Sequence, residues 1–252
     1  MVDPRDRFSA AADDYARYRP GYPDTIVTAC ADYAGLAPAA TVVDVGCGTG
    51  ISSRLFAAKG FRVIGVEPNE AMRAKAALAG GDVEYRAGEA AATGLPDACA
   101  DLIIAAQALH WFDMEPSLAE WRRVLKPGGA CAAFWNYRSD EGWQREYEDM
   151  LKRHSSEYPV VQKATGKGDD NSAWIKASPQ CSEVHEMNLH NAQTLDWDGL
   201  LGRAWSSSYV IHGNVNREVF NAELREMFDR HSREGQVKFA YNLYLLLWRI
   251  GP

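Results

Sequence analysis

Glycine recurs at every second position where a short apolar run ends. Residues 41–50 read Thr-Val-Val-Asp-Val-Gly-Cys-Gly-Thr-Gly, with one carboxylate, Asp44, inside the apolar run. A glycine backbone can bend sharply and lets a ligand come close, because it carries no side chain. The run is typical of a buried parallel strand, and the residues after it have helical spacing. A strand, a glycine turn and a helix form the first unit of a nucleotide-binding α/β sheet.

The glycine spacing favours one kind of cofactor over another. A dinucleotide fingerprint, G-x-G-x-x-G, needs its third glycine at the position of Ile51, so this turn reads G-x-G-x-G instead. With an acidic residue in the preceding strand, it resembles motif I of the class I S-adenosylmethionine-dependent methyltransferases. A glycine turn without this ligand is the alternative. The resemblance implies a loop under the methionine part of the cofactor, made by Asp44, Gly46, Cys47, Gly48, Thr49 and Gly50.

A carboxylate is expected where the second strand ends. Residues 62–66 are mostly apolar and lead into Glu67 and Pro68. A carboxylate at this point can accept hydrogen bonds from both hydroxyls of a ribose, as it does in dinucleotide-binding folds. The next helix is expected to begin after a cap at Asn69 and to place Met72 near the ligand. The alternative for Glu67 is a solvated charge at a strand end.

A third turn follows the strand expected at residues 83–86. By resemblance to the family, Gly88, Glu89 and Ala90 form the adenine side of the cofactor site, with the Glu89 carboxylate as an acceptor and the Ala90 amide as a donor. An adenine edge needs one acceptor and one donor across an otherwise apolar slot. A loop glutamate in water is the alternative.

Polar and aromatic residues also follow the fourth strand, expected at residues 101–106. Ligands of open α/β sheets bind outside the carboxyl ends of the strands, which predicts that Gln107, Ala108 and Trp111 face the cofactor. Trp111 could also shield the reactive sulfonium with its aromatic face. His110 has three open roles, namely a general base, a hydrogen-bonding contact or a packing residue beside Trp111.

The N-terminal residues resemble the flap of a small-molecule methyltransferase subgroup that includes the trans-aconitate methyltransferases. The resemblance is in the pattern Tyr15…Arg19-Pro20…Tyr22-Pro23. It implies that Tyr15 and Arg19 contact the cofactor, and an arginine suits a methionine carboxylate because its planar fork can bind both oxygens. A solvated helix end is an equal alternative.

The second half of the chain has weaker patterns. A helix over 115–125 and the turn Lys126-Pro-Gly-Gly precede a strand at 130–135, after which Trp135 and Asn136 are candidate substrate contacts. Residues 155–182 are rich in turn formers. Strands are expected at 184–189 and 237–248, the last one antiparallel. The segments between them would form a lid, with the substrate-side candidates Trp205, Ser206, Ser208 and Tyr209.

The composition narrows the partners. A net charge of −7 over 252 residues argues against wide contact with nucleic acid. The Asn/Asp-Pro-Pro-aromatic signature of enzymes that methylate exocyclic or amide nitrogens is missing after the fourth strand. Five cysteines without a C-x-x-C pair indicate reduced thiols and a cytoplasmic location. No signal peptide, membrane span or metal-ligand spacing is expected. The chain would be a monomer or homodimer.

These observations predict a doubly wound, Rossmann-like α/β fold. Its seven-stranded, mostly parallel sheet has an antiparallel last strand and a helical lid, similar to the Methyltransferase-11 and trans-aconitate methyltransferase-like group. The resemblance implies methyl transfer from S-adenosylmethionine to a small molecule, favouring carboxylate or hydroxyl oxygen. A non-catalytic cofactor-binding protein and a nicotinamide-dependent oxidoreductase are the alternatives. The expected parts are a flap (1–36), a cofactor-binding core (37–137), lid segments (138–182 and 194–235) and closing strands (183–193 and 236–252).

Overall fold

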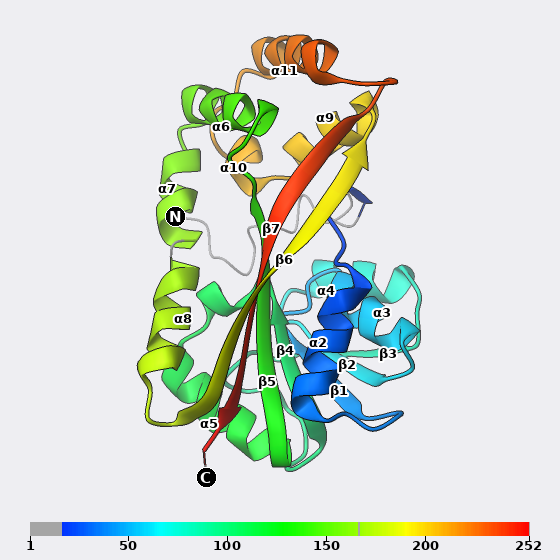
Figure 1. The fold of residues 1–252 in the computed structure, drawn as a ribbon, viewed down its shortest axis with the longest axis vertical. Coiled ribbons are helices and arrows are strands. Elements are labelled where there is room, and N and C mark those ends of the chain that lie inside the picture. Colours follow the sequence, from blue (N-terminus) through cyan, green and yellow to red (C-terminus); the bar gives the residue numbers. More distant parts are fainter. Residues whose placement is uncertain (1–16, 166, 252) are drawn as a thin grey trace.

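A seven-stranded sheet forms the centre of the computed structural model, which describes residues 17–165 and 167–251 (Figure 1). The strand order is β3-β2-β1-β4-β5-β7-β6, in which β1 to β5 are parallel and β7 is antiparallel to both β5 and β6. The predicted fold class is thereby confirmed. The strands are β1 (Thr41–Val45), β2 (Arg62–Val66), β3 (Val83–Arg86), β4 (Ala100–Ala106), β5 (Leu125–Arg138), β6 (Cys181–Leu195) and β7 (Val237–Ile250).

Helices cover both faces of the sheet. All five residues of β1 are buried, as expected for a central parallel strand. Helices α2 (Asp24–Ala34) and α3 (Ile51–Ala58) pack on one face through residues such as Ile26 and Phe56. Helices α5 (Met114–Val124) and α8 (Lys167–Ala177) pack on the other face, where Trp121 is fully buried. Helix α4 (Glu70–Leu78) lies beside β3, and a short 3-10 helix, η2 (Leu109–Trp111), follows β4.

A separate helical layer sits beyond one end of the sheet. The far ends of β6 and β7 extend past the other strands as a twisted ribbon that reaches this layer (Figure 1). Its own apolar cluster includes Tyr147, Leu200, Phe220 and Phe239. We call this layer the lid; it consists of α6 (Trp143–His154), α7 (Tyr158–Thr165), α9 (Trp197–Trp205), α10 (Ser208–Ile211) and α11 (Arg217–His231).

Several boundaries differ from the sequence prediction. The turn-rich residues 155–182 contain the helices α7 and α8, because Ile175 is buried in the core and this packing outweighs local turn preference. Strands β5 and β6 are longer than predicted, since β5 pairs with β7 from Tyr241 to Trp248 and β6 pairs with it from Val237 to Ile250. The lid segment predicted to begin at residue 194 therefore begins after Leu195, where Asp196 caps α9 by accepting from the Gly199 amide.

Candidate functional site

A pocket of about 470 Å³ opens at the carboxyl ends of the parallel strands. It lies where the strand order reverses between β1 and β4, the place where open α/β sheets bind ligands. Twelve of the predicted cofactor-binding residues line it: Gly46, Cys47, Gly48, Thr49, Glu67, Pro68, Met72, Glu89, Ala90, Gln107, Ala108 and Trp111.

The glycine turn forms the floor of the pocket, and its backbone conformation would be strained for a residue that carries a side chain. Gly46 has φ +68°, and a Cβ there would lie 2.8 Å from the Cβ of Ala108. Gly50 has φ +75°, and a Cβ there would overlap the hydroxyl of Tyr85. The amide of Gly46 donates to the carbonyl of Val66 at 2.8 Å, which ties the turn to the end of β2. Gly50 does not itself line the pocket, so it acts by setting the direction of α3.

Asp44 lies beneath the turn and does not line the pocket. Its side chain is fully buried, and one carboxylate oxygen accepts from the hydroxyls of Ser52 and Ser53, both at 2.6 Å. Burial raises the pKa of Asp44 to about 6, although the two serine hydrogen bonds oppose this. In this geometry Asp44 holds the first turn of α3 under the glycine loop, while its other oxygen, which is buried, has no hydrogen-bond partner among the described residues. Its contact with the cofactor stays a prediction.

Glu67 stands at the end of β2 with its carboxylate held from both sides. One oxygen accepts from the amide of Gly48 at 2.9 Å and the other accepts from the amide of Asn69 at 2.9 Å. The pKa of Glu67 is raised above its ordinary value because the carboxylate is buried, although these backbone hydrogen bonds oppose the shift. The predicted cap is present, because the Asn69 side chain accepts from the Met72 amide at 2.9 Å. The Glu67 carboxylate is therefore oriented in advance at the pocket wall.

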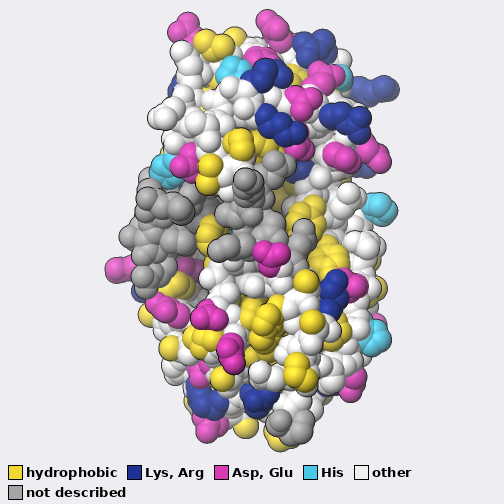
Figure 2. Space-filling view, turned by 90° about the vertical axis from the view of Figure 1, so that its left-hand side faces the viewer, with side chains coloured by type: hydrophobic (Ala, Val, Ile, Leu, Met, Phe, Trp, Pro, Cys, Tyr) yellow, Lys and Arg dark blue, Asp and Glu magenta, His cyan; other side chains and the backbone are white. Residues whose placement is uncertain are grey.

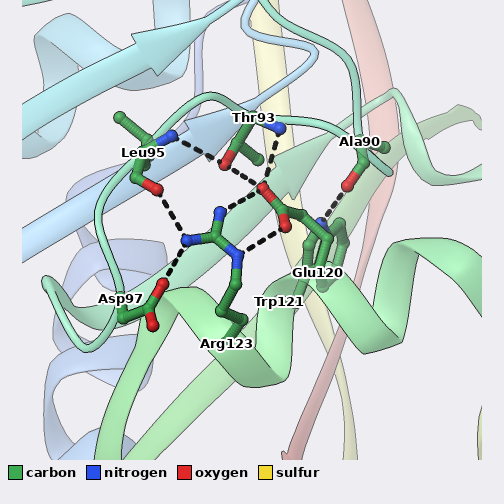
Figure 3. A network of polar contacts seen from close by, with 7 residues as sticks. All are labelled: Ala90, Thr93, Leu95, Asp97, Glu120, Trp121 and Arg123. Atoms are coloured by element: carbon green, nitrogen blue, oxygen red, sulfur yellow. Dashed lines mark hydrogen bonds and ion pairs between the residues drawn. The ribbon is translucent and has the colours of Figure 1, made fainter.

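The Glu89–Ala90 wall is anchored from behind by α5 (Figure 3). The Trp121 indole donates to the Ala90 carbonyl at 3.0 Å, and the Glu120 carboxylate accepts from the Thr93 amide at 2.9 Å. Gly88 does not line the pocket. It packs against the turn itself, since a Cβ there would lie 2.7 Å from the Thr93 carbonyl oxygen.

Arg123 completes this anchor. It pairs with Glu120 at 2.7 Å and with Asp97 at 2.6 Å, and it donates to the Leu95 carbonyl at 2.8 Å (Figure 3). The Arg123 and Thr93 hydrogen bonds lower the pKa of Glu120 to about 2. Sequence reasoning missed Glu120 and Arg123, because their partners Thr93, Leu95 and Asp97 lie 26 to 28 positions away and share no motif with them.

Gln107 forms the opposite wall with φ +57°, an unusual value for a side chain of this size. Its amide donates to the Phe134 carbonyl at 2.9 Å, and its side chain donates to the Asn136 carbonyl at 3.4 Å. Trp111 also lines the pocket and is 40% exposed, so its ring is available to a bound molecule.

His110 does not line the pocket. Its ring centroid lies 4.7 Å from that of Trp111, and its buried Nδ1 has no hydrogen-bond partner among the described residues. Burial lowers the pKa of His110 to about 4. The ring is therefore neutral at pH 7, and a base with so low a pKa is poorly matched to proton abstraction at that pH.

The predicted substrate residues lie outside the pocket lining. Trp135 is buried in the core, and Asn136 bonds to Gly21 and Asn191 between β5, β6 and the N-terminal segment. The Trp205 indole donates to the Asn221 side chain at 2.9 Å. The remaining candidates, Ser206, Ser208 and Tyr209, are buried or partly buried in the lid.

The predicted flap contacts are only partly described. Tyr15 lies outside the described residues. Arg19 donates to the Ser206 carbonyl of the lid at 3.3 Å and does not line the pocket, whereas Tyr22 does. Most other lining residues that were not predicted lie within two positions of predicted ones and could have been found by extending each motif; they are Ile51, Ser52, Asn69, Ala91, Ala106, Phe112 and Asp113. Ser117 lies further along the chain, on α5.

Among residues 17–165 and 167–251, no group of three or more His, Cys, Asp or Glu side chains is arranged to hold a metal ion. None of the helices found there combines the length and the apolar character needed to cross a membrane.

Comparison with known proteins agrees with this geometry. Residues 43–133 match a family described as methyltransferase domain. An uncharacterized methyltransferase of Mycobacterium tuberculosis is 33% identical over 159 residues, which cover 63% of this chain and 63% of that protein. An uncharacterized methyltransferase-like protein of Schizosaccharomyces pombe is 32% identical over 154 residues, which cover 60% of each chain. The match thus spans less than two thirds of the length of these relatives.

Solved structures extend the match to nearly the whole chain. A candidate type II methyltransferase from Anaeromyxobacter dehalogenans has a TM-score of 0.70 and 28% identity, and the match covers 93% of this chain and 99% of that one. The phosphoethanolamine N-methyltransferase 2 of Haemonchus contortus, solved with phosphomonomethylethanolamine and S-adenosylhomocysteine, has a TM-score of 0.53 and 13% identity, covering 100% and 61%. The [4+2]-cyclase SpnF has a TM-score of 0.51 and 14% identity, covering 99% and 96%. The last two show the fold alone.

Proposed function

Since the chain belongs to the class I methyltransferase family, we propose that it binds S-adenosylmethionine in the pocket beside Glu67 and transfers the methyl group to a small-molecule acceptor. The proposal rests above all on the Glu67 carboxylate, which the amides of Gly48 and Asn69 hold at the pocket wall. A carboxylate in this position can still accept hydrogen bonds from two ribose hydroxyls, because each oxygen has a second lone pair.

The other walls suit the remaining parts of this cofactor. The glycine turn would lie under the methionine portion, and Glu89 with the Ala90 amide would meet the adenine edge. The Haemonchus contortus enzyme of the same fold was solved with S-adenosylhomocysteine, which supports this choice of ligand. Fold alone is weaker support for catalysis, since the [4+2]-cyclase shares it.

Methyl transfer from a sulfonium is an in-line displacement: the acceptor atom attacks the methyl carbon, and S-adenosylhomocysteine leaves with the electron pair of the broken C–S bond. Little acid–base chemistry is needed, so alignment and exclusion of water would supply most of the rate enhancement. A carboxylate acceptor needs no base. This fits the lowered pKa of His110, and it favours a carboxylate over a phenol or alcohol.

Calorimetric titration with S-adenosylhomocysteine and, separately, with NAD tests the proposal. We expect the wild-type protein to bind S-adenosylhomocysteine and to ignore NAD. Glu67→Gln should bind about tenfold to a hundredfold more weakly, because it loses charge-assisted hydrogen bonds to the ribose. The matched control is Glu70→Gln, an exposed glutamate three positions along the chain, which should bind as wild type does.

Each alternative has its own outcome in these experiments. A folded wild-type protein that does not bind S-adenosylhomocysteine would refute the proposal, and NAD binding in its place would favour the oxidoreductase. Binding without turnover over a panel of organic acids and phenols would favour a non-catalytic cofactor-binding protein.

A further inference from the structure

Two arginines project into the interior of the lid without a carboxylate partner. Arg203 of α9 is 4% exposed, and Arg138 at the end of β5 is partly buried. Among the residues that the structure describes, neither forms an ion pair. Their hydrogen bonds go to neutral oxygens: Arg138 donates to the hydroxyls of Tyr158 and, at 3.4 Å, Tyr209, while Arg203 donates to Tyr241 at 3.2 Å and Ser207 at 3.1 Å.

Aromatic rings surround both guanidinium groups. The Arg138 guanidinium carbon lies 5.5, 5.3 and 6.0 Å from the ring centroids of Tyr147, Tyr158 and Tyr209. Contacts of this kind recover only part of the cost of removing a cation from water, so a buried guanidinium group without an opposite charge remains incompletely compensated. The outer surface of the lid is different: basic and acidic side chains are interspersed there (Figure 2), and pairs such as Arg230–Glu146 join α11 to α6.

A second observation points to a missing ligand. The Tyr147 hydroxyl in the same cluster is buried, and it has no hydrogen-bond partner among the described residues. A buried hydroxyl without a partner is costly, and an anion placed between the arginines would accept its hydrogen bond. Burial alone would raise the pKa of Tyr209, but the nearby Arg138 and Arg203 lower it to about 8. The lowered pKa of Tyr209 shows that the two guanidinium groups together favour a negative charge at this place.

We infer that Arg138, Arg203 and Tyr147 form a binding site for the anionic group of the methyl acceptor, a carboxylate or a phosphate, so that the substrate is an organic anion. This inference rests on the proposed methyltransferase function. Guanidinium groups suit both anions because their planar forks bind two oxygens at once.

The site and the cofactor pocket lie along the same strand. Strand β5 passes from Phe134, which pairs with Ala106 at the pocket, to Arg138 four residues further on, a rise of about 13 Å. The N-terminal segment connects the same two places, since Tyr22 lines the pocket and Arg19 donates to the Ser206 carbonyl of the lid. The acceptor would carry its anionic group in the lid and its methyl-accepting atom toward the pocket.

Titrations with succinate and with inorganic phosphate at constant ionic strength test the site, since surface charge effects are then held fixed. We expect saturable binding of at least one anion to the wild-type protein, and the stronger of the two identifies the group. Arg138→Met and Arg203→Met keep the apolar stems and remove the charges, and should each weaken binding about tenfold or more. Tyr147→Phe removes only a hydroxyl and should weaken anion binding severalfold. This variant still tests the site if an arginine variant does not fold. Arg217→Met, an exposed lid arginine over Trp205, is the matched control and should bind as wild type does.

S-adenosylhomocysteine binding is measured on the same samples and should stay within about twofold of wild type in every variant. Failure of that binding in the wild-type protein would refute the proposed function, whereas the anion titration reads out the site independently. The inference is overturned if neither anion binds, or if the arginine variants bind it as well as the wild-type protein does.

Discussion

The buried carboxylate beneath the glycine turn should make stability depend on pH in a direction opposite to that of most aspartates. Asp44 is fully buried, and its pKa is raised from an ordinary 3.8 to about 6. A raised pKa means that the folded protein binds this proton more tightly than the unfolded chain does. The contribution of Asp44 is therefore most favourable below pH 4 and is lost as the pH rises through 6.

The size of the effect follows from the shift. A shift of about two pKa units changes the free energy of unfolding of the wild-type protein by about 3 kcal/mol. About 2 kcal/mol of this change falls between about pH 4.5 and about pH 7.5. Asp44→Asn removes the titration but keeps an oxygen that can accept from Ser52 and Ser53. Between these two pH values, the free energy of unfolding of the variant should therefore rise by about 2 kcal/mol relative to that of the wild-type protein. This difference does not depend on how stable the variant is at the acidic pH.

Urea denaturation of both proteins at each pH, without ligand, measures this double difference. Carboxyl groups that do not interact with Asp44 titrate equally in both proteins, so they cancel; Glu67, whose charge helps to raise the pKa of Asp44, is the exception. Asp82→Asn, an exposed aspartate before β3, is the matched control and should remain parallel to wild type. If the Asp44→Asn and wild-type curves are also parallel to within about 0.5 kcal/mol, the buried carboxylate is not destabilised at neutral pH and the reasoning fails.

Two paired substitutions test the packing around the pocket. Gly50→Ala should lose more stability than Gly60→Ala in thermal unfolding, because both have positive φ but only the Cβ at Gly50 meets another side chain; equal losses would contradict the clash. The Gly60 variant should lose about 1 kcal/mol. Trp121→Phe should cost about 1–3 kcal/mol more than Trp248→Phe, since both rings are fully buried but only Trp121 donates a described hydrogen bond, to Ala90. Equal costs in urea denaturation would show that this hydrogen bond does not stabilise the pocket wall.

The parallel half of the fold could be predicted because its signals are local. The bounds of β3 and the cap at Asn69 agree with the sequence prediction, and the glycine turn is bounded by the expected strand and helix. Each of these features depends on residues within a few positions of one another. The same is true of the pocket lining, since the predicted residues that line it follow directly after parallel strands.

The lid could not be predicted in this way, because its contacts join distant parts of the chain. Nothing near Lys167–Ala177 in the sequence indicates that Ile175 is buried against the sheet, so the turn-forming residues around it dominated the prediction. Likewise, Tyr209 was expected to contact substrate on the basis of its place in the lid alone. Its position beside Arg138 follows only from the length of β5 and from the packing of α10.

The division between a local pocket and a nonlocal lid bears on how substrate choice is encoded. Arg138 and Arg203 are separated by 65 positions in the sequence, yet they meet the same tyrosine cluster, because β5 continues along β7 beyond its pairing with β4 and Arg203 of α9 donates to Tyr241 of β7. A glycine turn can be recognised from ten residues and can specify a cofactor. An anion site of the proposed kind has no sequence spacing to recognise, so the acceptor proposed for this chain follows from its folded lid rather than from a motif.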